Sequence, residues 1–431
     1  MEKLFKLGEN GTTVSRELAA GLTTFLTMAY ILAVNPEMLG RIGNGMTPEA
    51  VFSATVIASV IAMLVMAFAA NLPVALAPGM GLNAFFTYTV VFGMGYSWQT
   101  ALTAVFCEGV FFVILSLFNV REAIVKAIPT NLKHAVAVGI GLFITMIGLG
   151  NSGIMVRNEA TFVSLGNLTD GAPLVALIGT AITIILFARK IQGAILLGIL
   201  ITTVIGVPFG VTTIPQNFSP VRLPAAPLLL QFDFSAILSM KFFIVFFTFL
   251  FVDIFDTVGT LVGITTQAGL TNKNGDIPRV KQALVADAVG TIAGAALGTS
   301  TVTSYIESAS GVAAGGRTGL TNISTAALFL LALFLSPLFL LVPGAATAPA
   351  LIMVGFFMMR SVVNIDFNDP TEGIPAFFTI FMMPFAYSIA QGIVFGVLSY
   401  VIIKLLSGKL KDVNAVSIVL SVIFIIQLIL K

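Results

Sequence analysis

The chain has 431 residues, of which 58% are hydrophobic and 9% are charged, and its formal net charge is +2 at pH 7. Soluble globular proteins carry charge on about 25% of their residues, so this composition excludes a soluble domain and indicates a polytopic helical membrane protein. The small net charge gives no reason to expect a nucleic-acid partner. One cysteine excludes an intramolecular disulfide and a cysteine-based metal site.

Apolar runs, each close to the length of about 20 residues that crosses a bilayer, divide into two sets of seven around a loop at 208–240. The expected spans of the first half are 13–35, 50–70, 74–93, 98–118, 132–151, 172–188 and 191–207. Those of the second half are 241–269, 283–299, 301–316, 321–343, 345–362, 374–387 and 389–407. The remaining run, 413–430, either crosses the membrane or lies along its surface.

The distribution of basic residues predicts the orientation in the membrane. The N-terminus is polar and lacks the apolar core of a signal peptide, so we expect the first helix to enter uncleaved. If the N-terminus lies in the cytoplasm and successive loops alternate between the two sides of the membrane through fourteen spans, most of the 21 lysines and arginines fall on the cytoplasmic side. This is the bias that membrane proteins show in their cytoplasmic loops.

Two of these segments cannot be continuous helices. The third contains Pro73, Pro78 and Gly79 within LPVALAPGMGLNAFF, and the tenth reads TSTVTSYIESASG, which is β-branched and extended in character. We expect each to be an extended piece followed by a half-helix, beginning near Asn83 and near Glu307, with the extended pieces paired. Broken segments at the same place in two halves point to a transporter site, and an odd number of spans per half makes the repeat inverted.

Five carboxylates lie well inside apolar runs: Glu108, Asp253, Asp256, Asp287 and Glu307. An ionised acid at the centre of a bilayer costs at least about 2.5 kcal/mol, and no lysine or arginine lies deep in a predicted span to neutralise these five. A structural network of ion pairs would need such cations. Buried acids without them are suited to binding protons or ligands rich in N–H donors.

The acids differ in their predicted roles. Asp256 and Glu307 are the predicted substrate-binding acids, and Asp253, Glu307, Asp287 and Glu108 are the candidates for proton coupling. Four neighbours complete the predicted substrate site: Thr257 and Thr260 with their hydroxyls, Asn83 from the opposite half-helix, and Phe85, which can stack on a planar ligand. The sequence has no GxxxxGK[ST] and no HExxH motif, so we expect no enzyme, no catalytic residue, no metal and no organic cofactor.

Four stretches together resemble the AzgA-type purine permeases of the nucleobase–cation symporter-2 superfamily: LTTFLTMAYILAVNP at 22–36, APGMGLNAFFTYTVV at 77–91, FVDIFDTVGTLVG at 251–263 and TSYIESASGVAAGGRTGLT at 303–321. The resemblance covers nearly the whole chain. It implies an all-α membrane protein with fourteen segments in a seven-plus-seven inverted repeat, and short antiparallel strands in segments three and ten. A core domain would comprise 13–118 and 241–343, a gate domain 132–207 and 345–407, and 413–430 would be an extra segment.

The resemblance also implies an activity and a site. The activity is import of hypoxanthine, guanine or adenine across the cell membrane by proton symport, with the core moving against the gate. By motif, the binding acids fall on Asp256 and Glu307, and the third segment contributes Gly81 and Asn83. Thr260 stands where the uracil branch has a histidine, which favours the purine branch.

Several alternatives stay open at this point. An anion transporter or a uracil or xanthine transporter would have the same fold, but an anion site would call for positive charge in place of paired acids. A channel or a membrane enzyme is a different class, and an enzyme would need a nucleophile, metal or phosphate motif. The residues do not exclude sodium as the coupling ion, and a homodimer is expected by analogy of fold alone.

Overall fold

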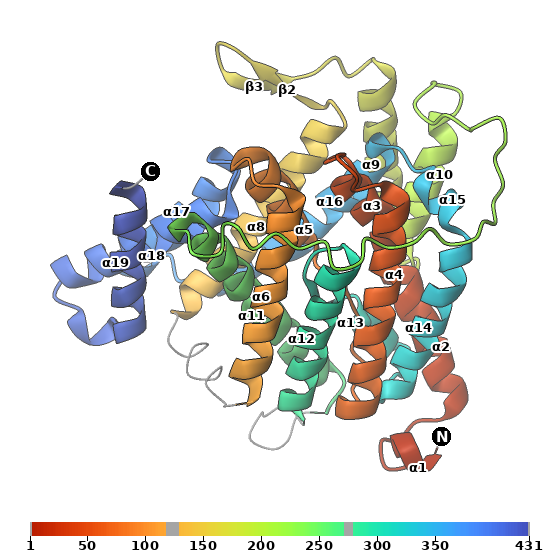
Figure 1. The fold of residues 1–431 in the computed structure, drawn as a ribbon, viewed down its shortest axis with the longest axis horizontal. Helices are drawn as coiled ribbons and strands as arrows, with labels where there is room; N and C mark the ends of the chain where they lie inside the picture. Colours follow the sequence, from red (N-terminus) through yellow and green to blue (C-terminus); the bar gives the residue numbers. More distant parts are fainter. Residues whose placement is uncertain (1, 118–128, 271–278, 430–431) are drawn as a thin grey trace.

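The computed structural model describes residues 2–117, 129–270 and 279–429, which form a bundle of mostly upright helices (Figure 1). Within these ranges, nine helical segments are long and apolar enough to cross a membrane, and four shorter apolar helices accompany them. The predicted segment ends at 118 and 430 lie outside the described residues.

The first half follows the predicted series of spans, with one addition. The hairpin between α8 and α9 was not expected from the sequence. The elements are α1 (Glu2–Phe5), α2 (Val14–Met28), α3 (Ile31–Gly40), α4 (Pro48–Val65), the π-helical η1 (Met66–Ala70), β1 (Leu76–Pro78), α5 (Met80–Ala84), the π-helical η2 (Phe85–Gly93), α6 (Trp98–Leu117), α8 (Thr130–Asn151), β2 (Met155–Asn158), β3 (Phe162–Leu165), α9 (Gly171–Ala188) and α10 (Ala194–Gly206).

The second half repeats this order of long helices around a broken third segment. Each predicted span coincides with a helix or with a strand and half-helix. The elements are α11 (Met240–Gln267), α12 (Val280–Leu297), β4 (Val302–Ser304), α13 (Ser308–Ala313), α14 (Gly319–Phe334), α15 (Ser336–Leu340), α16 (Gly344–Met359), the 3₁₀ turn η3 (Arg360–Asn364), α17 (Pro370–Phe385), α18 (Ile389–Leu406), η4 (Leu410–Asp412) and α19 (Ala415–Ile429).

The extended pieces of the two broken segments pair with each other. Strands β1 and β4 are antiparallel, with Ala77 opposite Thr303. The backbone N–H of Gly79 donates to the Thr301 carbonyl at 2.9 Å, which continues the pairing beyond the strands. Buried backbone groups must find partners inside the protein because the bilayer offers none, and this pairing supplies them. The predicted antiparallel strands are confirmed.

The half-helices begin beside this strand pair. The second begins at Ser308, directly after Glu307, which is where the sequence places it. The first begins at Met80, three residues before the predicted start near Asn83, because Gly79 is the last residue with extended backbone. A Cβ on Gly79 would lie 2.8 Å from Thr303 Oγ1, so glycine permits the close approach of the two segments.

The helices pack into two groups. In the first, which we call the α12 group, α6 and α4 pack on α12, α2 and α4 pack on α14, and α3, α5, α11 and α13 complete the assembly. In the second, the α8 group, α8 packs on α16 and α17, α17 packs on α18, and α9 and α10 pack on α16. The strand pair belongs to the α12 group, because β1 and β4 contact α4 and α12.

A long coil between α10 and α11 runs across the outside of the α12 group (Figure 1). Its backbone is anchored where the N–H of Leu228 donates to the Leu297 carbonyl at 3.0 Å. Asp233 accepts a hydrogen bond from Thr100 Oγ1 at 2.9 Å. Hydrogen bonds from Ser235, with a smaller contribution from Thr100, hold the pKa of the Asp233 carboxyl below its ordinary value.

A buried carboxylate joins α2 to the start of α14. Glu17 is fully buried and accepts hydrogen bonds from the backbone N–H groups of Arg317, Thr318 and Thr321 at 2.9, 3.3 and 3.1 Å. The hydroxyl of Thr321 donates to the same carboxylate at 2.5 Å. Thr321 lies in the first turn of α14, where N–H groups lack partners inside the helix, and Arg317 and Thr318 directly precede the helix. Glu17 satisfies these groups from a segment about 300 residues away in the sequence.

Replacement of Glu17 by alanine should destabilise the protein, because it leaves buried N–H donors without an acceptor. The expected loss of stability is about 2–4 kcal/mol. A lower melting temperature of the purified protein in detergent would report it. Glu9→Ala is the matched control, because Glu9 is exposed and pairs only with Lys6 nearby. Equal melting temperatures for the two variants would contradict the capping role.

Candidate functional site

A cavity of about 1110 Å³ lies between the two helix groups. A purine base is far smaller than this volume, so the cavity includes both a site and an access route. The α12 group contributes Thr27, Gly81, Asp256, Thr260, Glu307 and Ser310 to its wall. The α8 group contributes Val136, Ile140, Ala194, Ile195, Phe357 and Met358. Both helix groups therefore contribute to the wall of this cavity.

Two carboxylates from different elements meet in the cavity. Asp256 lies in the middle of α11, and Glu307 lies at the start of α13, three residues after the strand β4 ends. They are close enough to interact electrostatically, and Thr303 of β4 contacts the Asp256 carboxylate. The structure thus brings together the two acids that the sequence singles out for substrate binding.

Tyrosine side chains hold the Glu307 region in place. Tyr30 lies at the break between α2 and α3, and its hydroxyl donates to Glu307 Oε1 at 2.7 Å. Tyr305 donates to the Pro78 carbonyl at 2.6 Å, and the two rings lie 6.4 Å apart. Tyr30 thus fixes one oxygen of a carboxylate that lines the cavity. Sequence reasoning did not identify Tyr30, although its motif, AYILAVNP, belongs to the first matched stretch.

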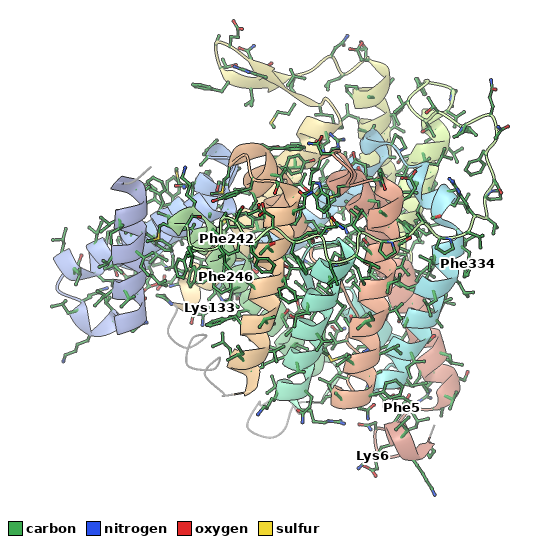
Figure 2. All side chains as sticks on the ribbon, in the orientation of Figure 1. Phe5, Lys6, Lys133, Phe242, Phe246 and Phe334 are labelled. Carbon is green, nitrogen blue, oxygen red and sulfur yellow. The ribbon has the colours of Figure 1, made fainter. Side chains whose placement is uncertain are left out.

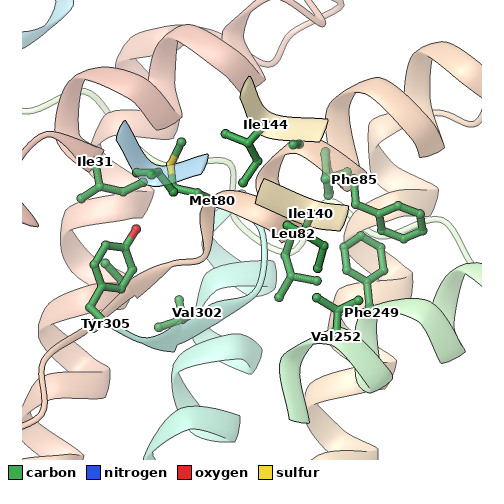
Figure 3. Close-up of a cluster of buried hydrophobic side chains, with 14 of the residues drawn as sticks. Ile31, Met80, Leu82, Phe85, Ile140, Ile144, Phe249, Val252, Val302 and Tyr305 are labelled. Carbon is green, nitrogen blue, oxygen red and sulfur yellow. The ribbon is translucent and has the colours of Figure 1, made fainter. Parts of the chain in front are cut away.

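Gly81 and Thr260 also line the cavity, as the sequence predicts. A Cβ on Gly81 would lie 2.7 Å from Ile140 Cγ2, so the glycine lets the first half-helix approach α8 closely. The contacts of α5 and η2 with their neighbours are largely apolar here, as Figure 3 shows for Leu82, Phe85 and Phe249.

Two other predicted site residues lie behind the cavity wall. Asn83 is fully buried, where its amide oxygen accepts a hydrogen bond from Ser300 and its amide nitrogen lies 3.5 Å from the Pro78 carbonyl. Phe85 is fully buried and packs edge-on against Phe249, with ring centroids 4.8 Å apart (Figure 3). Both side chains stabilise the broken third segment, and their contact with a substrate stays a prediction.

The remaining acids form a second cluster, fully buried. Thr257 Oγ1 donates to Asp287 at 2.7 Å, Thr301 Oγ1 donates to Glu108 at 2.8 Å, and Glu108 contacts Asp253. Three of the four candidates for proton coupling are therefore neighbours. Thr257, predicted as a substrate ligand, lies with them.

The strand β4 separates the two acidic clusters. Successive side chains of a strand point to opposite faces. Thr303 accordingly contacts Asp256 in the cavity, whereas Ser304 donates to Asp287 at 3.4 Å on the other side. One short extended segment thus touches both the predicted substrate site and the predicted proton-coupling acids.

Basic residues occupy a different part of the cavity. Lys133 and His134 lie in the first turns of α8, and Lys190 and Arg360 follow the ends of α9 and α16. Figure 2 shows Lys133 at the lower end of α8, on the side of the molecule where the N-terminal Lys6 also lies. The lining residues Lys190, Gln192 and Arg360 are exposed at that end. We therefore place the mouth of the cavity there, with cations around it and the acids at the floor.

Comparison with known proteins identifies the family. Residues 15–395 match the family model described as Permease family. The chain is 49% identical to the putative permease MJ0326 of Methanocaldococcus jannaschii, over 99% of this chain and 98% of that protein. It is 46% identical to the guanine/hypoxanthine permease PbuG of Bacillus subtilis, over 100% of this chain and 99% of that protein. It is 44% identical to the adenine permease AdeQ of Escherichia coli, over 100% of this chain and 96% of that protein.

A solved structure supports the fold independently. The transmembrane domain of the cyanobacterial bicarbonate transporter BicA superposes with a TM-score of 0.67 over 89% of this chain and 97% of that chain, at 15% sequence identity. At this identity the likeness concerns the fold alone, and it confirms the predicted seven-plus-seven inverted repeat. The chain belongs to the permease family, within the nucleobase–cation symporter-2 superfamily that its four motifs resemble.

Proposed function

We propose that this protein is a secondary active transporter that imports purine nucleobases, namely hypoxanthine, guanine or adenine, by proton symport. The observation that carries the proposal is the pair of carboxylates, Asp256 and Glu307, at the floor of a cavity between two helix groups. A purine base is planar, nearly neutral and bears N–H groups along its edge. Carboxylates accept such groups in strong, charge-assisted hydrogen bonds, and relatives with 44–46% identity carry the names of adenine and guanine/hypoxanthine permeases.

The main alternative is an anion transporter, because the same fold occurs in a bicarbonate transporter. Two carboxylates at the floor would repel an anion, and the cations of the cavity lie at its mouth. Uracil or xanthine as substrate is the alternative within the family. Competition of labelled hypoxanthine uptake by unlabelled adenine, uracil, xanthine and sulfate separates these possibilities.

The two helix groups suggest how transport proceeds. In this proposal the α12 group belongs to the core domain, 13–118 and 241–343, and the α8 group to the gate domain, 132–207 and 345–407. Movement of the first against the second, in the manner of an elevator, would carry the acid pair from one face of the membrane to the other. If the N-terminus lies in the cytoplasm, the mouth of the cavity faces the cytoplasm. In a homodimer, contacts between the gate domains of the two subunits would hold these domains fixed while the core domains move.

Neutralising either floor acid should weaken substrate binding. Uptake of radiolabelled hypoxanthine by cells without their own purine permeases should be saturable and abolished by a protonophore. Asp256→Asn and Glu307→Gln should each raise KM by about tenfold or more, because each replaces a charged acceptor.

Glu159→Gln is the matched control, because Glu159 is an exposed acid between β2 and β3 and far from the cavity. It should transport as the unmodified protein does. Unchanged KM in both floor variants would remove Asp256 and Glu307 from the site. Failure of every purine to be taken up, with the protein present in the membrane, would contradict the proposed substrate class.

Removal of the Tyr30 hydroxyl should loosen the orientation of Glu307. Tyr30→Phe keeps the ring and is expected to raise KM by roughly tenfold, since a hydrogen bond to a charged group is worth about 1.5 kcal/mol or more. Maximal velocity at saturating substrate should change much less. Tyr400→Phe is the control, because Tyr400 is a buried tyrosine that donates to the Asp412 carbonyl. Equal KM values in the two variants would contradict the positioning role.

The second acidic cluster is the proposed site of proton coupling, together with Glu307. Glu108→Gln and Asp253→Asn should retain exchange of internal for external base, because the floor acids remain. Both variants should lose accumulation driven by a pH gradient. Exchange and accumulation measured in reconstituted vesicles, with sodium present or absent, distinguish this role from sodium coupling. Full accumulation in an amide variant would eliminate that acid.

A further inference from the structure

We propose that Glu37, Arg41, Asn151 and Tyr88 form a polar latch that keeps the cavity closed at the end opposite its mouth, and that this latch must open during each transport cycle. The inference rests on the proposed transport function but concerns a different part of the molecule. The exposed residues of the cavity wall lie where α8 begins and α9 and α16 end, and we place its mouth at this end. The latch lies at the other end of these helices, near the top of Figure 1, where α3 and α8 end.

The latch is a continuous chain of hydrogen bonds between the two helix groups. On α3, the Nε of Arg41 donates to Glu37 Oε1 at 2.6 Å. The Nη1 of Arg41 then donates to Asn151 Oδ1 at 3.1 Å, which joins the end of α3 to the end of α8. The Nδ2 of Asn151 donates to the Tyr88 hydroxyl at 2.8 Å. Tyr88 lies in η2, which continues α5 of the α12 group and packs on α6.

Aromatic rings extend this closure to the junction of α17 and α18. The Tyr88 ring packs edge-on against Tyr387 at a centroid distance of 6.1 Å, and Tyr387 packs on Phe143 of α8 at 5.4 Å. Thr89 Oγ1 donates to the Tyr387 carbonyl at 3.4 Å. Tyr387 has a φ of 51°, a left-handed conformation that costs free energy in a residue other than glycine. Contacts with both helix groups thus hold Tyr387 in place.

The start of α16 also fits closely against the latch. Gly344 is the first residue of α16, and a Cβ built on it would lie 2.6 Å from Arg41 Nη2 and 3.0 Å from Glu37 Oε1. The absence of a side chain at Gly344 therefore allows the charged pair to sit against the α8 group. Three elements of that group, α8, α16 and the α17–α18 junction, converge on one arginine and one tyrosine.

The chemistry of these contacts suits a closure that opens repeatedly. The net contribution of each hydrogen bond to stability is small, and water can replace it when the groups separate. The Arg41 side chain is 36% exposed, so water already reaches it. The Glu37–Arg41 pair lies within one turn at the end of α3 and can stay intact during opening. Opening would break the Asn151 contacts, the Thr89–Tyr387 hydrogen bond, and the packing of Tyr88 on Tyr387 and of Gly344 on Arg41.

The test measures access to the closed end with a single reporter cysteine. Ile144→Cys in a Cys107→Ser background places the thiol on α8, one turn from the cavity residue Ile140 toward Asn151. Ile144 is fully buried, and Figure 3 shows it with Ile140 near Leu82 of the other group. Adding Asn151→Ala should raise the rate of labelling by a membrane-impermeant thiol reagent about tenfold, since it removes contacts worth about 1.4 kcal/mol.

The rise should appear from one membrane face only, as compared in intact cells and inside-out vesicles. Tyr88→Phe, which keeps the ring, should act in the same direction. Asn158→Ala is the matched control, because Asn158 is at the same end and accepts only from Ala160 and Thr161 within its hairpin. Labelling of the Asn151→Ala protein at the rate of this control would overturn the latch. The assay needs no substrate, so its outcome is independent of the proposed transport of purines.

A second measurement asks whether opening is required for transport. Arg41→Cys and Asn151→Cys, joined by a short cleavable thiol crosslinker, should lose hypoxanthine uptake and regain it when the crosslink is cleaved. Uptake at full rate with the crosslink in place would contradict the proposal. The uncrosslinked double variant controls for loss of folding, because its melting temperature and its basal uptake are measured in the same preparation.

Discussion

The structure depends on one constraint: backbone interrupted at membrane depth must satisfy its polar groups inside the protein. The strands β1 and β4 meet that constraint by pairing with each other. Asn83 and Tyr305 add side-chain hydrogen bonds across the same junction, to Ser300 and to the Pro78 carbonyl. Two segments that would each be unstable alone thus become one rigid element, on which the floor of the cavity is built.

The same strand pair separates the intramembrane acids into two clusters. A strand presents alternate side chains to opposite faces, so β4 touches Asp256 through Thr303 and Asp287 through Ser304. Buried acids in one undivided cluster would repel one another strongly. Division by a strand leaves one acid pair accessible to a ligand and another cluster sealed from it, while a single element contacts both.

The sequence predicted what depends on local chemistry. Hydropathy located the spans, proline and glycine located the broken segments, and buried charge singled out Asp256 and Glu307. It could not predict contacts set by the rotation of a helix about its axis. Thr257 is adjacent to Asp256 in the sequence, but consecutive residues of a helix point in different directions, and Thr257 donates to Asp287 instead of lining the cavity. Nothing local in the sequence distinguishes Tyr30 from other tyrosines in apolar spans. Its role depends on a contact with Glu307, 277 residues away, that only the fold creates.

The position of charge within the cavity explains why acids and cations can coexist in it. An interaction between charges weakens with distance and with access to water. The cations at the mouth lie at helix ends, whereas the floor acids lie at the centre of α11 and at the start of α13. Cations bonded directly to the floor acids would occupy the acceptors that a base needs. Cations at the mouth instead leave the floor to hydroxyl groups, because Tyr30 donates to Glu307 and Thr303 contacts Asp256. Both carboxylates can therefore still accept hydrogen bonds from a ligand that is rich in N–H donors.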